Sequence, residues 1–165
     1  MIFMKYTIRM ILLILTLVFS ANLLMVYAYE EIKLPSVSLQ PGMTYYPAKR
    51  LFEKFMEKLQ FSSDAKEKYY YDLLGVRLSE LNNIVEKDNR NEVEKSTQRV
   101  SYQVGVLTDY IVEKRLDNKK QQVINLYKSY RIILEKLRDK YPANSSYWML
   151  VQHIINSIDI NLKKL

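Results

Sequence analysis

The sequence predicts an all-α protein: an N-terminal membrane or signal helix, then a bundle or set of elongated hairpins of about five helices. The first observation is composition, since the 165 residues include only 3 Gly and 4 Pro while 26% are charged, which favours helices. The second is that apolar residues recur every three or four positions beyond residue 46, with no alternating run of strand length. The third is an uncharged apolar stretch near the N-terminus.

That stretch, residues 10–28, follows Lys5 and Arg9 and contains 19 residues without a charge. As a helix it would be about 28 Å long, enough to cross a hydrocarbon core. It is either an uncleaved signal anchor or a signal peptide cleaved after Ala28, before Tyr29. A third interpretation is a buried core helix. The two preceding cations favour an N-terminus inside and the rest of the chain outside. We therefore expect a bacterial cytoplasmic membrane protein with its domain outside, or a secreted or periplasmic protein.

Residues 29–46 lack a sustained period and contain Pro35, Pro41 and Gly42. This composition is typical of a linker or extended tether. We therefore divide the chain into residues 1–28, the linker 29–46 and a helical domain at 47–165.

The first domain helix is predicted from Pro47 to about residue 60, because proline suits the first helical turn. Its apolar residues form one stripe: Leu51, Phe52, Phe55, Met56 and Leu59. Its basic residues lie mostly off that stripe: Lys49, Arg50, Lys54 and Lys58. We expect the apolar stripe to pack on the tyrosine-rich helix that follows.

The second helix is predicted over about residues 64–87. Asp64 and Glu67 have the spacing of a capping box, and Ser62 and Ser63 are alternative caps. One face carries Tyr70, Leu74, Arg77, Leu78, Leu81 and Val85. Gly75 within this helix indicates either close approach of another element or simple tolerance.

Three further apolar seams follow at heptad-like spacing. The first is Val93, Thr97, Val100, Val104, Leu107 and Ile111; the second is Val123, Tyr127, Tyr130, Leu134, Leu137 and Tyr141. The third is Trp148, Val151, Ile155, Ile158, Leu162 and Leu165, widened by Ile154 and Ile160. The change of phase near residues 116–118 favours a break, although one helix over about residues 91–140 fits as well. The sequence at Tyr141–Ser146 ends the fourth helix.

Residues 45 to about 115 resemble an uncharacterised bacterial family of extracytoplasmic helical domains. The matching elements are Tyr46, Pro47, Lys49, Arg50 and Glu53, then Phe61, Asp64, Ala65 and Lys66, then Arg77, Leu78, Glu80 and Leu81. The chain departs from the pattern at Ser63 and Gly75. The resemblance implies a helical fold outside the membrane and no assigned reaction.

Catalytic and metal-binding chemistry has little support in the sequence. There is no Cys, and His153 is the single His, so no thiolate or paired-His metal site is available. There is no glycine-rich phosphate loop and no nucleophile elbow. We expect no enzyme activity and no cofactor; a wall-acting hydrolase with an unrecognised carboxylate pair is the remaining enzymatic alternative.

Two features are candidates for partner binding. Tyr69, Tyr70 and Tyr71 cannot all face one core, because successive helix residues point about 100° apart; they form either an aromatic docking patch or contacts with the preceding helix. Lys49, Arg50 and Lys54 either meet anionic lipid or are simply solvated.

The functional prediction is a non-enzymatic helical interaction, scaffold or sensor module of the bacterial envelope. Its partners would be the membrane, through residues 10–28 if uncleaved, and another envelope protein or an anionic envelope polymer. The alternative is an extracytoplasmic chaperone or envelope-stress sensor that binds unfolded chains. The net charge of +7 favours anionic partners, but export argues against nucleic acid. The sequence does not specify an oligomeric state.

Overall fold

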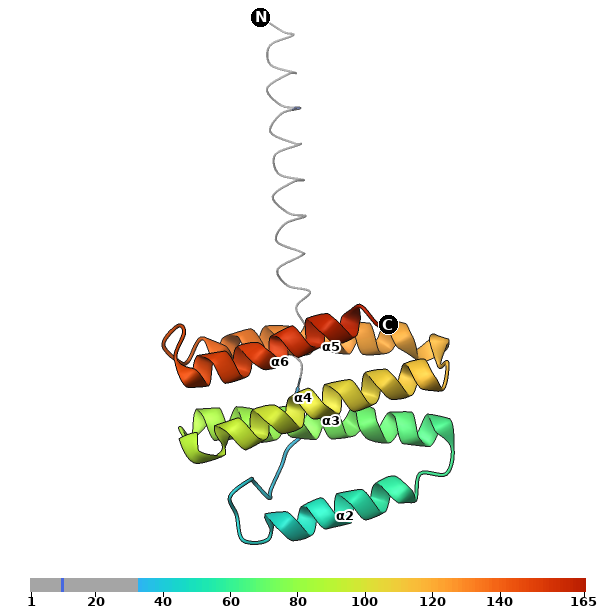
Figure 1. Ribbon diagram of the computed structural model, residues 1–165, viewed down its shortest axis with the longest axis horizontal. Helices are drawn as coiled ribbons and strands as arrows, with labels where there is room; N and C mark the ends of the chain where they lie inside the picture. Colours follow the sequence, from blue (N-terminus) through green and yellow to red (C-terminus); the bar gives the residue numbers. More distant parts are fainter. Residues whose placement is uncertain (1–9, 11–32) are drawn as a thin grey trace, which may run out of the picture. The chain divides into compact units, whose positions relative to one another are not determined.

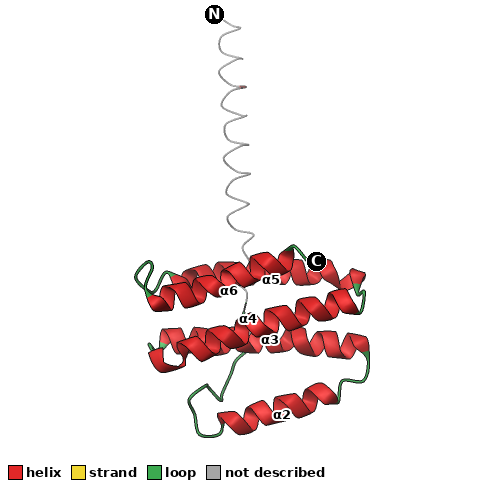
Figure 2. Cartoon of the chain, viewed as in Figure 1, coloured by secondary structure: helices red, strands yellow, loops and turns green. Residues whose placement is uncertain are grey.

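A computed structural model describes Met10 and residues 33–165, and every secondary-structure element named here lies in a unit formed by residues 34–165 (Figure 1). The helices are α2 (Tyr46–Lys58), α3 (Ser63–Glu86), α4 (Arg90–Glu113), α5 (Asp117–Arg138) and α6 (Ser146–Leu162). No strand occurs among these described residues, as Figure 2 shows. The predicted signal or anchor segment, residues 10–28, lies outside the described residues apart from Met10. None of the helices that the structure describes is both long and apolar enough to span a bilayer.

The core is built from the four longer helices, α3 to α6. α4 packs against both α3 and α6, and α6 also packs against α5 (Figure 1). The seams predicted on α4 and α5 are confirmed, since every member is buried. On α6 the seam is partly confirmed: Val151, Ile155 and Ile158 are buried, but Ile160 is 58% exposed.

The predicted break between the third and fourth domain helices is confirmed. α4 ends at Glu113 and α5 begins at Asp117. Arg115 between them has a φ of +51°, a left-handed conformation that ends a helix. The amide of Leu116 then donates to the carbonyl of Ile111 at 3.0 Å, so the turn closes on the last turn of α4 and the two helices form a hairpin.

The start of α3 differs from the favoured capping box. Ser62 is the cap, and its hydroxyl accepts a hydrogen bond from the amide of Ala65 at 3.1 Å. Asp64 lies inside the first turn, where its charge suits the positive end of the helix. Glu67 is 2% exposed and faces Lys119 at 3.7 Å. Glu67 therefore contributes to the contact with α5 rather than to a cap.

α2 is turned the opposite way from the prediction. The apolar stripe expected to pack on α3 points to solvent: Leu51 is 71% exposed, Phe52 62% and Phe55 57%. The opposite face, which carries Tyr46, Lys49 and Glu53, contacts α3. The reason is that α3 offers charged and hydroxyl groups on this side, so the polar face of α2 finds bonding partners there.

The second half of the predicted tether is part of the domain. Pro35 lies against Gly75 of α3, and Pro41 is buried. A Cβ at Gly75 would lie 3.5 Å from Pro35 and 3.0 Å from the hydroxyl oxygen of Tyr130. Of the two explanations for Gly75, close approach is therefore confirmed. Residues 34–45 cross the bundle before α2 begins.

Candidate functional site: a basic pocket between α2, α3 and α4

A buried guanidinium organises the contact between α2 and α3. Arg77 is a residue of α3 and its side chain is 1% exposed. Its Nη1 donates to both carboxylate oxygens of Glu80, one turn further along α3, at 2.9 Å each. Its Nη2 donates to Glu53 of α2. One guanidinium therefore binds a carboxylate from each helix. Buried charges require such a partner, because an unpaired charge away from water is costly.

Two residues of α2 complete this ion-pair network. Lys49 binds Glu80 through its ammonium group, and Tyr46 donates from its hydroxyl to the other oxygen of Glu80 at 2.9 Å. Glu80 is 1% exposed, and these groups satisfy both of its oxygens. The network consists of Tyr46, Lys49, Glu53, Arg77 and Glu80.

The network shifts two pKa values in directions that preserve it. Burial first, and then the negative charge of Glu80, raise the pKa of the Tyr46 hydroxyl well above its usual value, so the phenol stays a donor. Burial lowers the pKa of Arg77, but its hydrogen bond to Glu53 and the charge of Glu80 outweigh this and raise the pKa overall. Arg77 therefore remains a guanidinium at every pH at which the protein is folded.

The predicted tyrosine patch is largely used inside the fold. Tyr69 donates to the backbone carbonyl of Glu53 at 2.6 Å, and Tyr70 donates to the carboxylate of Glu57 at 2.6 Å. Tyr70 is buried and its ring lies edge-on to Tyr110. Tyr71 is half-buried. Tyr69 and Tyr70 thus hold α2 in place through its polar face rather than through the phenylalanines.

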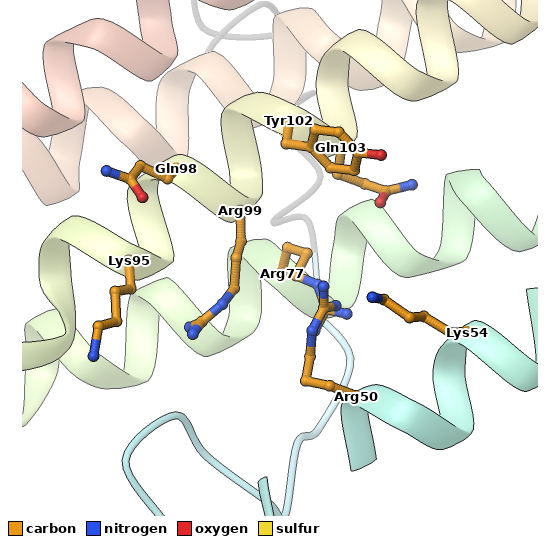
Figure 3. A pocket seen from close by; sticks show the side chains of 8 residues that line it. All are labelled: Arg50, Lys54, Arg77, Lys95, Gln98, Arg99, Tyr102 and Gln103. Carbon is orange, nitrogen blue, oxygen red and sulfur yellow. The ribbon is translucent and has the colours of Figure 1, made fainter. Parts of the chain in front are cut away.

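A cavity of about 430 Å³ opens beside the ion-pair network (Figure 3). α2 contributes two residues, α3 one and α4 five. They are Arg50, Lys54, Arg77, Lys95, Gln98, Arg99, Tyr102 and Gln103. Five of these eight side chains are cationic and none is a carboxylate. We call this cavity the basic pocket.

The positive charge of the basic pocket is only partly neutralised. Lys54 and Arg99 form no ion pair with any described carboxylate, whereas Arg50 is paired with Glu53 at 3.0 Å and Lys95 lies 4.0 Å from Glu92. Arg99 instead lies over the ring of Tyr46, 5.0 Å from its centroid. The tyrosine holds the guanidinium in place without cancelling its charge. This wall is therefore suited to an anionic group.

The sequence predicted part of this site. Of the basic residues singled out, Arg50 and Lys54 line the basic pocket, while Lys49 is bound to Glu80 in the network beside it. The contribution of α4 was missed. Lys95 and Arg99 are four residues apart and so share a helix face, which was the available signal. Nothing in the sequence indicated that this face meets α2.

The described residues offer little for catalysis or metal binding. They contain no group of three or more His, Asp or Glu side chains placed to hold a metal ion, and His153 is exposed on α6. Glu53 and Glu80 are a carboxylate pair near a cavity, but both are bound to Arg77 and neither lines the basic pocket. Their geometry is that of an ion-pair network.

Comparison with known proteins identifies the family. The family described as Domain of unknown function (DUF5667) matches residues 38–143. The chain belongs to this family. The match begins in the segment that crosses the bundle and ends after α5, so it includes the network, the basic pocket and most of the core. The matched range is longer at both ends than the resemblance described in the sequence analysis, which covers residues 45 to about 115. No curated protein and no solved structure matches the chain.

Proposed function

We propose that this DUF5667 domain is a non-enzymatic interaction module of the bacterial envelope, and that its basic pocket binds an anionic group of an envelope polymer or protein. The observation that carries the proposal is the pair of cations, Lys54 and Arg99, without a carboxylate partner in the wall of a cavity. A phosphate or carboxylate group would supply the missing negative charge and accept hydrogen bonds from both.

The export that the sequence predicts is consistent with this role. The apolar residues 10–28, preceded by Lys5 and Arg9, are suited to deliver the rest of the chain across a membrane. Anionic polymers are abundant outside bacterial membranes, so the proposed location and the charge of the pocket are consistent.

Binding is tested with the full chain in detergent micelles. The ligands are inorganic phosphate, polyphosphate and an acidic peptide, and isothermal titration calorimetry is the measurement. We expect at least one polyanion to bind, and Arg99→Gln or Lys54→Gln to weaken binding about tenfold, in line with the loss of one charge-assisted hydrogen bond. Lys128→Gln is the matched control, because Lys128 is an exposed lysine on α5 away from the pocket. Equal affinities of all variants, or no binding of any anion, would refute the proposal.

Location is tested by cysteine labelling, because the chain has no Cys of its own. Met149 is 59% exposed on α6, so Met149→Cys offers an accessible thiol. In intact cells we expect a membrane-impermeant maleimide to label it. Labelling only after lysis would place the domain in the cytosol.

A further inference from the structure

The outer face of α2 is the largest group of exposed apolar side chains in the described part of the chain. Four of its residues are Leu51, Phe52, Phe55 and Leu59, and Tyr45 and Phe61 extend the face at the two ends of the helix. Phe61 is 90% exposed. Contiguous exposed apolar surface of this kind marks a site of interaction. We call these six residues the apolar face.

The apolar face is fixed toward solvent by the bonds on the other side of α2. Glu53 binds Arg77, Lys49 binds Glu80, and the hydroxyl of Tyr70 donates to Glu57. Rotating α2 to bury its phenylalanines would break these bonds, and Arg77 and Glu80 would then have only each other as partners in a buried position. The outward orientation is therefore a stable property of the fold.

The charges that flank the apolar face along α2 itself are positive. Lys54 and Lys58 are exposed on α2 beside the stripe, and neither forms an ion pair among the described residues. The two carboxylates of α2, Glu53 and Glu57, point toward α3. An apolar helix face flanked by cations is suited to an anionic lipid surface, where the rings enter the headgroup region and the ammonium groups meet the headgroups.

The same charges argue against a second copy of the chain. A two-fold symmetric contact would place the apolar face against itself. Lys54 and Lys58 of each copy would then approach their counterparts, while the carboxylates of α2 point toward α3. α2 also forms the outer edge of the described domain (Figure 1), so its outer face is convex. A bilayer accommodates a convex surface, whereas a protein partner would need a matching groove.

We propose that α2 docks the domain on the surface of an anionic bilayer through its apolar face. The side chains of Phe52, Phe55 and Leu51 enter the interface, and Lys54 and Lys58 bind anionic headgroups. This inference goes beyond anion binding in the basic pocket, which lies between α2, α3 and α4 and shares only Lys54 with the docking surface.

The test uses the full chain reconstituted in vesicles, with a polarity-sensitive dye on a single cysteine. Ala48→Cys places the dye at an exposed position of α2. Met149→Cys is the matched control, because it places the dye at an exposed position of α6. The vesicles are phosphatidylcholine alone or mixed with phosphatidylglycerol, each containing spin-labelled lipid as the quencher. We expect quenching at residue 48 in the anionic vesicles, much weaker quenching in the neutral ones, and little at residue 149 in either.

Variants then separate the two proposed sites. Phe52→Asn with Phe55→Asn should abolish quenching at residue 48 while leaving phosphate binding and the circular dichroism spectrum unchanged, because both rings are exposed. Lys58→Gln should reduce the docking equilibrium about fivefold. Arg99→Gln should weaken polyanion binding and leave docking unchanged.

Three outcomes would overturn the docking proposal. One is equal quenching at residues 48 and 149. Another is quenching that survives the double asparagine substitution. The third is disulfide formation between copies of the unlabelled Ala48→Cys protein in lipid-free micelles, which would assign the apolar face to a dimer.

Discussion

Arg77 is the residue on which the attachment of α2 depends most directly. Arg77 and Lys49 each pair with both Glu53 and Glu80, and of these two cations Arg77 is the fully buried one. A buried ion pair adds little net stability when intact, because desolvation offsets the attraction, but removing one partner leaves an uncompensated charge. The cost of losing Arg77 should therefore greatly exceed the value of an average salt bridge.

Arg77→Met keeps the aliphatic volume of the side chain and removes its charge. We expect the free energy of unfolding to fall by about 3–5 kcal/mol, because Glu53 and Glu80 lose the guanidinium that donates hydrogen bonds to both and keep only Lys49 as a shared cation. Urea unfolding followed by circular dichroism measures the change. Lys68→Met is the control, because Lys68 pairs with Asp72 on the exposed side of α3, and it should leave the midpoint unchanged. If the two variants unfold at the same midpoint, the network does not stabilise the fold.

At the scale of single elements, the four core helices could be predicted because their apolar residues share one face. The seams of α4 and α5 are buried at every position that the spacing selected. Helical periodicity therefore identified both the elements and their inward faces wherever that face was apolar.

Periodicity failed for α2 because it shows which side chains share a face but not which face turns inward. The choice depends on what the neighbouring helix offers, and α3 offers Arg77 and Glu80. The sequence held one sign of this, since Arg77 falls on the face of α3 that otherwise carries its buried leucines. A charged residue at a core position needs a charged partner, and α2 carries such a partner in Glu53. The favoured capping box of α3 was wrong for a similar reason, because Glu67 pairs with Lys119 of another helix, whereas the alternative cap Ser62 is confirmed.

The seam of α4 gives a prediction for an element as a whole. Leu107 is fully buried, so Leu107→Asp would place an unpaired carboxylate in the core. We expect a loss of more than about 4 kcal/mol and cooperative melting of the domain at a much lower temperature. Val112→Asp is the matched control, because Val112 lies on the same helix and is 43% exposed. An unchanged melting temperature for Leu107→Asp would refute the assignment of this seam.

At the scale of the described domain, the five helices are held by two different kinds of contact. The helices α3 to α6 share a continuous apolar core. α2 is attached mainly through ion pairs and tyrosine hydroxyls, and its large apolar side chains Leu51, Phe52 and Phe55 are exposed. Regions with few buried apolar contacts open at lower free energy than the core. We therefore expect α2 to open and close as a unit while the other helices remain folded.

Hydrogen exchange resolves this difference, because each amide reports the free energy of the opening that exposes it. Amides of residues 46–58 should exchange faster than those of residues 93–111 under native conditions. Lys49→Met should accelerate exchange in α2 alone, because Lys49 bonds only to groups outside the core seams, whereas Lys58→Met on the outer face should change nothing. If α2 and α4 exchange with one common free energy, α2 belongs to the cooperative core.

If α2 opens alone, docking on an anionic surface should also change its exchange rate. The surface would have to bind the closed form of α2 more tightly than the open form. Anionic vesicles should then slow exchange of the α2 amides by the same factor by which they favour the closed, docked form.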